Sequence, residues 1–294
     1  MKSIWLILII IIGLLIIVPN LRASTNKTKP ASGAAFEDRA KTRSKESYTP
    51  KEQHETRVYL TMTTLPERVT TDWFYKNLVK NIATASKNNF TIILNIPRIS
   101  VKTGEPYFIP MNIKQLVSPH FIINYTEKDE GPITKLLPTL RNPLVKSNDI
   151  IIVCDDDIVY KENVFEMIYL SVQRRPKSVS AMCNVKIEGF KTFGFKKKML
   201  EPLLSMSIPK SCFRIDDDVI QFFIDTRCIP IVAVPYLSDT EWDCSIHFEE
   251  SEDHPRWEEL KNDDRKPMQA TCLNELRQII PKNSSLLQSN CPLR

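Results

Sequence analysis

Three consecutive acids, Asp155, Asp156 and Asp157, are the residues best placed to do chemistry. They follow the apolar run 150–154 without a gap, so a strand that ends there presents their carboxylates at the edge of a sheet, where open α/β sheets bind ligands. Adjacent acids repel one another, and a divalent cation with a preference for oxygen relieves that repulsion. The pattern predicts a Mg²⁺ or Mn²⁺ site that bridges phosphate oxygens and stabilises a departing diphosphate. A solvated acidic turn is the alternative.

A second acidic triplet, Asp216, Asp217 and Asp218, opens a segment that is typical of a helix, with its apolar face over 219–223. Acids in a first helical turn are favoured by the helix dipole, and this stabilising role alone would explain them. The functional interpretation is that one of these carboxylates removes a proton from an acceptor hydroxyl.

The segment 131–135, Gly-Pro-Ile-Thr-Lys, follows an acidic stretch at 127–130. Gly131 permits a tight turn, exposed amides before a helix can meet phosphate, and Lys135 supplies positive charge. The six glycines of the chain form neither GxGxxG nor GxxxxGK[ST], which disfavours the dinucleotide-binding and P-loop folds.

Short apolar runs alternate with helical stretches between residue 57 and residue 235. The helical period predicts a helix over 71–85, with Thr71 as its N-cap, and another over 163–173. The apolar runs predict strands over 57–62, 90–96, 121–125, 149–154, 179–182 and 229–234. Continuously apolar strands separated by helices imply a mixed, mostly parallel sheet with helices on both faces, which is α/β architecture.

The composition is typical of one globular domain with appendages, since the chain has 294 residues, of which 42% are hydrophobic and 26% charged. The formal net charge is +5, but Lys2 and the segment 19–56 carry most of it, which leaves the body nearly neutral. Nucleic-acid binding needs a concentrated basic face, so we exclude nucleic acid as a partner.

The seven cysteines form no CxxC pair, which excludes zinc-ribbon and thioredoxin interpretations. Their odd number leaves at least one thiol unpaired, and Cys154, inside an apolar strand, fits a small core residue. The four cysteines nearest the C-terminus would be able to pair in an oxidising lumen.

The N-terminal run 4–18 has no charged residue and predicts a transmembrane signal anchor over 1–21. A cleavable signal peptide is the alternative, although no small-x-small cleavage site follows the run. Residues 22–56 are polar and rich in Lys, Ser and Thr, and they predict a flexible stem ahead of a folded body over 57–294.

The orientation of this anchor stays open. The downstream flank, with Arg22, Lys27 and Lys29, is more basic than Lys2 and the amino terminus, and the positive-inside rule then argues for a cytosolic body. Triplets of the form Asn-x-Ser/Thr fit glycosylation in a lumen instead. They begin at Asn26, Asn89, Asn124 and Asn283. We expect a single-pass protein of the ER/Golgi type with a lumenal body, with the cytosolic orientation as the alternative.

Taken together, these motifs resemble those of a GT-A-fold glycosyltransferase, similar to the family-2-like enzymes. The resemblance covers about 57–235, and the order and spacing of its motifs are more specific than any one of them; from Leu237 onward the chain matches the pattern poorly. The matching positions are 63–68 (Thr-Thr-Leu-Pro-Glu-Arg), 95–97 (Asn-Ile-Pro), 129–136 (Asp-Glu-Gly-Pro-Ile-Thr-Lys-Leu), 155–160 (Asp-Asp-Asp-Ile-Val-Tyr), 188–190 (Glu-Gly-Phe) and Asp216-Asp217 ahead of a helix.

The resemblance implies separate roles for the two triplets. Asp155 and Asp157 would flank the metal and the ribose–diphosphate. Asp217 would be the catalytic base, with Asp216 as its substitute if the register is off by one. The register is ambiguous because Asp218 stands where an apolar residue is expected.

The resemblance also places residues around these triplets. Arg68, Asp129 and Lys135 would lie near the nucleotide-sugar, and 189–197 would form part of the acceptor side. His247 or His254 would complete the metal site, as a late histidine does in many enzymes of this fold. A surface histidine is the alternative, because the stretch around His247 is acidic.

By this resemblance the chain is an inverting glycosyltransferase whose catalytic domain spans 57–294. It would use Mn²⁺ or Mg²⁺, take a sugar from a nucleotide-sugar donor and transfer it to a hydroxyl of a glycan, lipid or protein acceptor. Two other functions stay open. One is a metal-dependent nucleotidyltransferase or phosphohydrolase, and the other is an inactive, membrane-tethered carbohydrate-binding protein.

Overall fold

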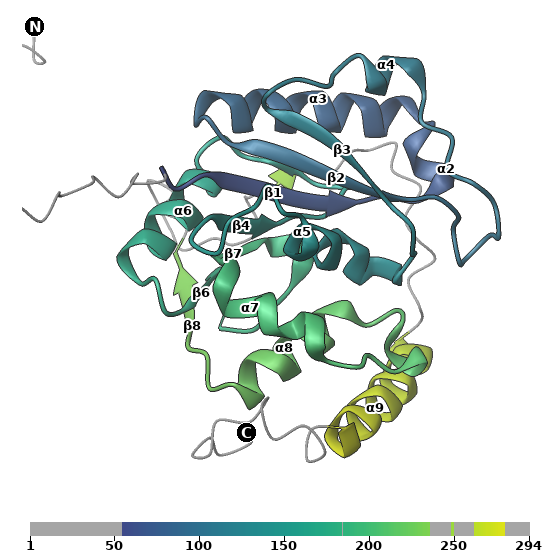
Figure 1. Ribbon diagram of the computed structural model, residues 1–294, viewed down its shortest axis with the longest axis vertical. Coiled ribbons are helices and arrows are strands. Elements are labelled where there is room, and N and C mark those ends of the chain that lie inside the picture. Colours follow the sequence, from purple (N-terminus) through teal and green to yellow (C-terminus); the bar gives the residue numbers. More distant parts are fainter. Residues whose placement is uncertain (1–54, 184, 236–247, 250–261, 280–294) are drawn as a thin grey trace, which may run out of the picture. The chain divides into compact units, whose positions relative to one another are not determined.

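A seven-stranded sheet forms the centre of the computed structural model (Figure 1). The structure describes residues 55–183, 185–235, 248–249 and 262–279, all within the unit His54–Arg294. The strand order is β3-β2-β1-β4-β7-β6-β8. The strands are β1 (Val58–Thr63), β2 (Thr91–Pro97), β3 (Phe121–Thr126), β4 (Ile150–Val153), β6 (Val179–Met182), β7 (Phe193–Lys196) and β8 (Ile231–Val234). A separate two-stranded sheet pairs β5 (Val159–Tyr160) with β9 (Phe248–Glu249).

The sheet is mixed and mostly parallel, as the sequence predicts. Strands β3, β2, β1 and β4 are parallel, as are β6 and β8, whereas β7 runs antiparallel to both β4 and β6. Alternate side chains of a strand point to opposite faces. Thus Leu60 and Ile152 belong to one buried apolar cluster, and Tyr59 and Ile151 belong to the other.

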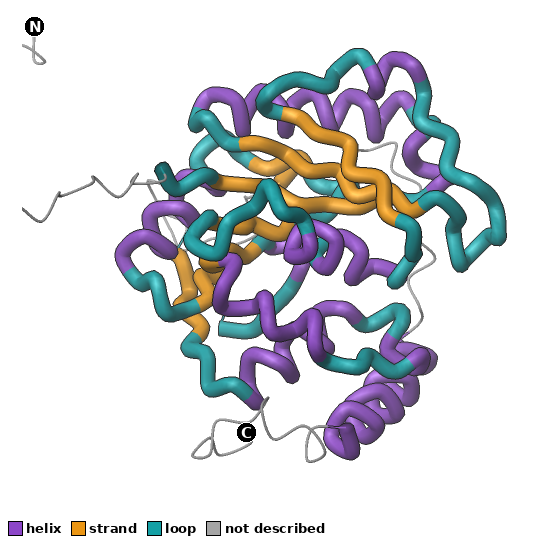
Figure 2. The backbone as a smooth tube through the Cα atoms, viewed as in Figure 1, coloured by secondary structure: helices purple, strands orange, loops and turns teal. Residues whose placement is uncertain are grey.

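Helices cover both faces of the sheet, which Figure 2 shows as a layer of strands between layers of helix. On the Leu60 face lie α2 (Pro66–Val69), α3 (Asp72–Lys87), α4 (Met111–Lys114) and α6 (Val164–Arg174). On the Tyr59 face lie α5 (Leu137–Arg141), α7 (Lys197–Leu200), α8 (Asp216–Thr226) and α9 (Asn262–Ile279). Short 3-10 helices are η1 (Gly131–Lys135), η2 (Gly189–Lys191), η3 (Glu201–Ser205) and η4 (Lys210–Cys212).

Local sequence signals account for most element boundaries. The predicted N-cap, Thr71, precedes α3, and its Oγ1 accepts a hydrogen bond from the Phe74 amide at 3.3 Å. Within the seven-stranded sheet, β7 is the strand that the sequence does not predict. Its two aromatic residues flank Gly194, where a Cβ would lie 2.5 Å from Ile168 Cγ2. Because β7 packs this closely against α6, the middle position takes glycine, and the glycine interrupts the apolar run that would predict a strand.

No helix among the described residues is long and apolar enough to cross a membrane. The predicted anchor, 1–21, and nearly all of the predicted stem, 22–56, lie outside the described residues.

One disulfide joins the short helix η4 to α9, the last helix that the structure describes. Cys212 of η4 is bonded to Cys272 of α9. Cys183 and Cys228 are also disulfide-bonded. Cys154 is the free thiol among the described cysteines; it is buried, and burial raises its pKa above the usual range. This agrees with its prediction as a core residue.

Candidate active site

Both acidic triplets reach one pocket at the edge where β1 and β4 end. Because β1 and β4 are parallel neighbours, with Thr61 opposite Val153, the segments that follow them emerge at the same edge of the sheet. The pocket has a volume of about 380 Å³, within the range of small-molecule sites. Its charged lining consists of Arg68, Lys102, Asp129, Lys135, Asp155, Asp156, Asp157, Arg214, Asp216 and Asp217.

The pocket gathers all but one of the site residues that the sequence predicts. The predicted metal and donor residues Arg68, Asp129, Lys135, Asp155 and Asp157 line it, together with both candidates for the base. His247 and its alternative, His254, lie outside the described residues. The structure therefore brings these residues together, and their chemical roles remain predictions.

Arg68 is a buried guanidinium held by the first triplet. It lies in α2, directly after β1, and its Nη1 donates to Asp156 Oδ1 at 2.6 Å and lies 3.3 Å from Asp157 Oδ2. Thr64 Oγ1 donates to the other oxygen of Asp156 at 2.7 Å. Burial raises the pKa of Asp156 to about 7, although the guanidinium of Arg68 opposes the rise. Asp156 thus engages both carboxylate oxygens within the protein and fixes Arg68 at the pocket wall.

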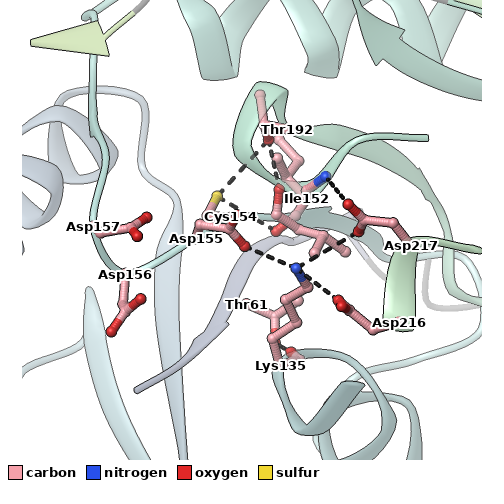
Figure 3. A network of polar contacts seen from close by, with 12 residues as sticks. Thr61, Lys135, Ile152, Cys154, Asp155, Asp156, Asp157, Thr192, Asp216 and Asp217 are labelled. Carbon is pink, nitrogen blue, oxygen red and sulfur yellow. Dashed lines mark hydrogen bonds and ion pairs between the residues drawn. The ribbon is translucent and has the colours of Figure 1, made fainter. Parts of the chain in front are cut away.

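Lys135 is a second buried cation, placed by η1 after β3. Its Nζ lies 2.8 Å from Asp155 Oδ1, 2.8 Å from Asp216 Oδ2 and 3.8 Å from Asp217 Oδ1. Figure 3 shows the ammonium between the carboxylate of Asp155 on one side and the two α8 carboxylates on the other. The ammonium therefore links the two triplets.

A polar cluster on β1, β2 and α5 holds the backbone of Lys135. Asn95 Nδ2 donates to the Lys135 carbonyl at 3.1 Å and to Thr139 Oγ1 at 3.0 Å. The Thr61 hydroxyl donates to the same carbonyl. All of these groups are buried, so an unpaired one would be costly, and the cluster keeps η1 in one position against the sheet.

The first turn of α8 separates the members of the second triplet. Asp216 pairs with Lys135, and Asp217 Oδ2 accepts a hydrogen bond from the Gly189 amide at 2.9 Å. Asp218 Oδ1 instead accepts one from Gln269 Nε2 of α9 at 2.7 Å. Asp218 is buried and does not line the pocket. This explains why an acid stands where the motif has an apolar residue: the position faces α9.

The charges of the pocket act on one another because they are buried together. Burial raises the pKa of the Asp217 carboxyl to about 7; Asp216 adds to the rise, and Lys135 opposes it. Burial also raises the pKa of Asp155, again against the effect of Lys135. Burial by itself would lower the pKa of Lys135, but the surrounding carboxylates raise it well above its usual value. A carboxyl group with a near-neutral pKa, such as Asp217, is suited to accept a proton.

Asp155 and Asp157 are the residues of this pocket that fit a divalent cation. Mg²⁺ is commonly bound through one or two carboxylates, with substrate phosphates and waters completing its shell. Both side chains line the pocket and keep some exposure, 26% for Asp155 and 28% for Asp157. The residues that the structure describes contain no group of three or more side chains that would hold a cation by themselves.

Asp129 lines the pocket and joins two backbone segments there. Its Oδ1 accepts from the Gly131 amide and its Oδ2 from the Val101 amide, both at 2.8 Å. Gly131 has a φ of +74°, and a side chain there would collide with the carbonyl of Phe213. Glycine at this position therefore lets η1 lie against the segment that leads into α8.

The sequence-based prediction assigned no role to Thr64, which donates to Asp156. It included Asp156 in the acidic triplet and Gly189 in the acceptor side, but it did not predict that Asp156 holds Arg68 or that the Gly189 amide meets Asp217. Thr64, Asp156 and Gly189 all stand inside the matched motifs, so their positions were visible, but their partners lie far away in sequence. The sequence contains no signal for those pairings.

Comparisons with known proteins give a partial likeness. No model of a known protein family matches the chain, and no curated protein matches it in sequence. Among solved structures, the mannosyltransferase PcManGT from Pyrobaculum calidifontis in complex with GDP-Man and Mn²⁺ is 12% identical, with a TM-score of 0.44 over 62% of this chain and 55% of that chain. TarS of S. aureus is 9% identical, with a TM-score of 0.41 over 60% of this chain and 58% of that chain.

A third structure covers more of both chains. It is named as a nucleotide-diphospho-sugar transferase from Desulfovibrio desulfuricans G20 and is 9% identical, with a TM-score of 0.41 over 77% of this chain and 97% of that chain. The present chain thus spans little more than half the length of the first two structures. At such TM-scores and identities these likenesses carry no functional argument, and the function proposed below rests on the side chains of the pocket.

Proposed function

We propose that this protein is a metal-dependent glycosyltransferase, which moves a sugar from a nucleotide-sugar donor to a hydroxyl acceptor with inversion at the anomeric carbon. The observation that carries the proposal is the meeting of both acidic triplets with Arg68 and Lys135 in one pocket. A leaving diphosphate needs compensating positive charge, and an attacking hydroxyl needs a base. The pocket offers groups for both tasks.

The wall formed by the first triplet is the donor side. Asp155 and Asp157 would hold Mg²⁺ or Mn²⁺ there, because they are the partly exposed carboxylates at the end of β4. The chemistry that such a cation supplies is neutralisation of the charge that develops on the leaving nucleoside diphosphate. Arg68, locked by Asp156 and Thr64, orients the diphosphate against this wall.

The wall formed by α8 is the acceptor side. Asp217 lines the pocket, is held by the Gly189 amide, and has a pKa raised to about 7. It accepts the proton of the acceptor hydroxyl while that oxygen bonds to the anomeric carbon and the bond from this carbon to the diphosphate oxygen breaks. A single displacement of this kind inverts the configuration at the carbon, and Asp217 needs no second carboxylate to act as nucleophile.

The test of this function is the release of nucleoside diphosphate. The purified full chain is incubated with Mn²⁺ and a panel of nucleotide-sugars, and we expect one donor to yield nucleoside diphosphate and to lose that activity in Asp157→Ala or after chelation with EDTA. Release of inorganic phosphate or pyrophosphate would identify a phosphohydrolase or nucleotidyltransferase instead. Binding of donors without any release would identify an inactive carbohydrate-binding protein.

We also propose that the body faces an ER/Golgi lumen behind the N-terminal anchor. Asn89 is exposed in the turn between α3 and β2, whereas the side-chain amide of Asn124 in β3 donates to Asn95 Oδ1 at 2.7 Å. In a lumen Asn89 would therefore carry a glycan and Asn124 would not. After expression in a secretory eukaryotic cell, Asn89→Gln should increase gel mobility and Asn124→Gln should leave it unchanged. A body that proteases digest in sealed, right-side-out microsomes would establish the cytosolic orientation.

A further inference from the structure

We infer that Lys135 is a positioning residue of this site and not a contact of the donor. Its buried ammonium holds Asp155 of the donor wall and Asp216 and Asp217 of the acceptor wall in one cluster, and thereby sets the distance between donor and base (Figure 3). The inference rests on the proposed function. It reverses the role that the sequence predicts for Lys135, which is a direct contact with the nucleotide-sugar.

The first argument is the surroundings of the Lys135 ammonium. Its side chain is 7% exposed, and the oxygens of Asp155 and Asp216 are both 2.8 Å from Nζ. The ammonium donates a hydrogen bond to Asp155 Oδ1, whereas its contact with Asp216 Oδ2 is an ion pair without hydrogen-bond geometry. Asp217 Oδ1, at 3.8 Å, adds a third negative charge. A lysine surrounded by three carboxylates is more than neutralised, so it offers little attraction to the phosphates of a donor.

The second argument is that the position of Lys135 is fixed at both ends. Its carbonyl accepts hydrogen bonds from Thr61 and Asn95 at the core of the sheet, and its ammonium meets the carboxylates. Lysine usually combines a flexible stem with a mobile charge. Here neither the backbone nor the charge is free to move, which is what a spacer between two walls requires.

The third argument is Gly189, which closes the space above the ammonium. A Cβ at this position would collide with Lys135 Nζ and lie 3.0 Å from Asp217 Oδ1 and 3.1 Å from Asp155 Oδ1. The Gly189 amide also donates to Asp217 Oδ2 at 2.9 Å. The cluster is therefore closely packed on the side of Gly189, and the ammonium has no room to move toward this residue without pressing on Asp155 or Asp217.

The test separates positioning from donor binding and from stability. Three variants of the full chain are compared: Lys135→Met, Gly189→Ala and, as the matched control, Lys197→Met. Lys197 ends the segment predicted for the acceptor side, but its amide donates to the carbonyl of Asp149 at the start of β4, whereas the pocket lies at the end of that strand. It is another buried lysine, whose Nζ donates to the carbonyl of Val145 at 2.8 Å, and it does not line the pocket. Gly189→Ala keeps every charge and displaces the flexible end of Lys135, so it serves if Lys135→Met fails to fold. For each variant we measure kcat of transfer, the Kd of the product nucleoside diphosphate in the presence of Mn²⁺, and the unfolding midpoint.

We expect Lys135→Met to lower kcat by about 100-fold and Gly189→Ala by at least about tenfold, because small misplacements of reacting groups are costly. The Kd should change by less than about threefold in both variants, and Lys197→Met should keep kcat even where its unfolding midpoint falls. A Kd weakened by more than about tenfold with nearly unchanged kcat would make Lys135 a donor contact and overturn the inference. Equal losses of kcat in Lys135→Met and Lys197→Met would mean that Lys135 acts only through the stability of the fold, and would overturn the inference. If the wild-type chain itself releases no nucleoside diphosphate, the proposed function fails, and the inference falls with it.

Discussion

The two Asp-Asp-Asp triplets of this chain have identical sequences but divide their side chains differently. The first lies in the turn after β4, where the middle residue, Asp156, is buried on Arg68 and the outer two keep 26% and 28% exposure. The outer carboxylates line the pocket, where Asp155 pairs with Lys135 and Asp157 with Arg68, while the middle one is buried and serves the structure. In this turn, the first and third acids line the pocket, and the second holds Arg68.

The second triplet lies in the first turn of α8, where each residue is rotated by roughly 100° relative to the one before it. Asp216 and Asp217 consequently face the pocket, and Asp218 points to Gln269 of α9. The comparison teaches that the backbone decides which acids of a triplet are functional. The number of acidic residues in a triplet does not predict which of them face the pocket.

The largest effect that tests this division is expected within α8. Asp217→Asn should lower kcat by about 10²–10⁴-fold, the usual contribution of a general base. Asp218→Asn, one residue further along, should keep kcat within about twofold, because it faces α9 and not the pocket. Steady-state kinetics of transfer compare the two. A larger loss of kcat in Asp218→Asn than in Asp217→Asn would mean that the base is the third acid of the triplet and not the second.

Within the first triplet, we expect substitutions of the middle and the outer acid to differ strongly in their effect on stability. Asp156→Ala removes the nearer of the two carboxylates that pair with the buried guanidinium of Arg68, which should lower the free energy of unfolding by about 3–5 kcal/mol. Asp157→Ala removes a carboxylate that is 28% exposed and should cost about 0–1 kcal/mol. Urea unfolding of both variants provides the measurement. Equal losses in the two would mean that the middle and outer acids are equivalent.

The pH dependence of activity tests whether α8 supplies the base. Only the carboxylate form of Asp217 accepts a proton, and burial raises its pKa to about 7. The value of kcat/KM should therefore fall by about tenfold per pH unit below that pKa and level off above it. The residual activity of Asp217→Asn should lack this slope. An unchanged slope in that variant would assign the titration to another group.

The smallest effect is expected at the third position of α8. Asp218→Ala removes the hydrogen bond to Gln269 and should lower the free energy of unfolding by about 1 kcal/mol. The loss is limited because the Cys212–Cys272 disulfide also holds α9. Thermal unfolding measures the change. A loss as large as that of Asp156→Ala would contradict the peripheral role of Asp218.

Local patterns in the sequence predict much of this fold. The run 150–153 is apolar and β-branched, and it forms the fully buried strand β4; Thr71 caps α3 as its position indicates. Strand β7 escapes prediction because Gly194 interrupts its two phenylalanines and leaves no apolar run. Its pairing with β4 and β6 is a long-range property that no local window contains.

The residues of the pocket are predictable from motifs, but their partners are not. The pair Arg68–Asp156 joins residues 88 positions apart, and the contact from Lys135 to Asp216 crosses from η1 to α8. The motif around Lys135 predicts a positive charge near a phosphate, but it does not predict that Gly189 and three carboxylates surround this charge. Electrostatic surroundings of this kind arise only when distant segments meet.

The most direct test of the account is whether substitutions in the two triplets have different effects on the affinity for a nucleotide. Calorimetric titration of UDP, GDP and CDP, with and without Mn²⁺, is compared for the wild type, Asp157→Ala and Asp217→Asn. The account predicts that one nucleoside diphosphate binds in a Mn²⁺-dependent manner, that Asp157→Ala weakens this binding by at least about tenfold, and that Asp217→Asn changes it by less than about twofold. Equal weakening in both variants would contradict the division into a donor wall and an acceptor wall.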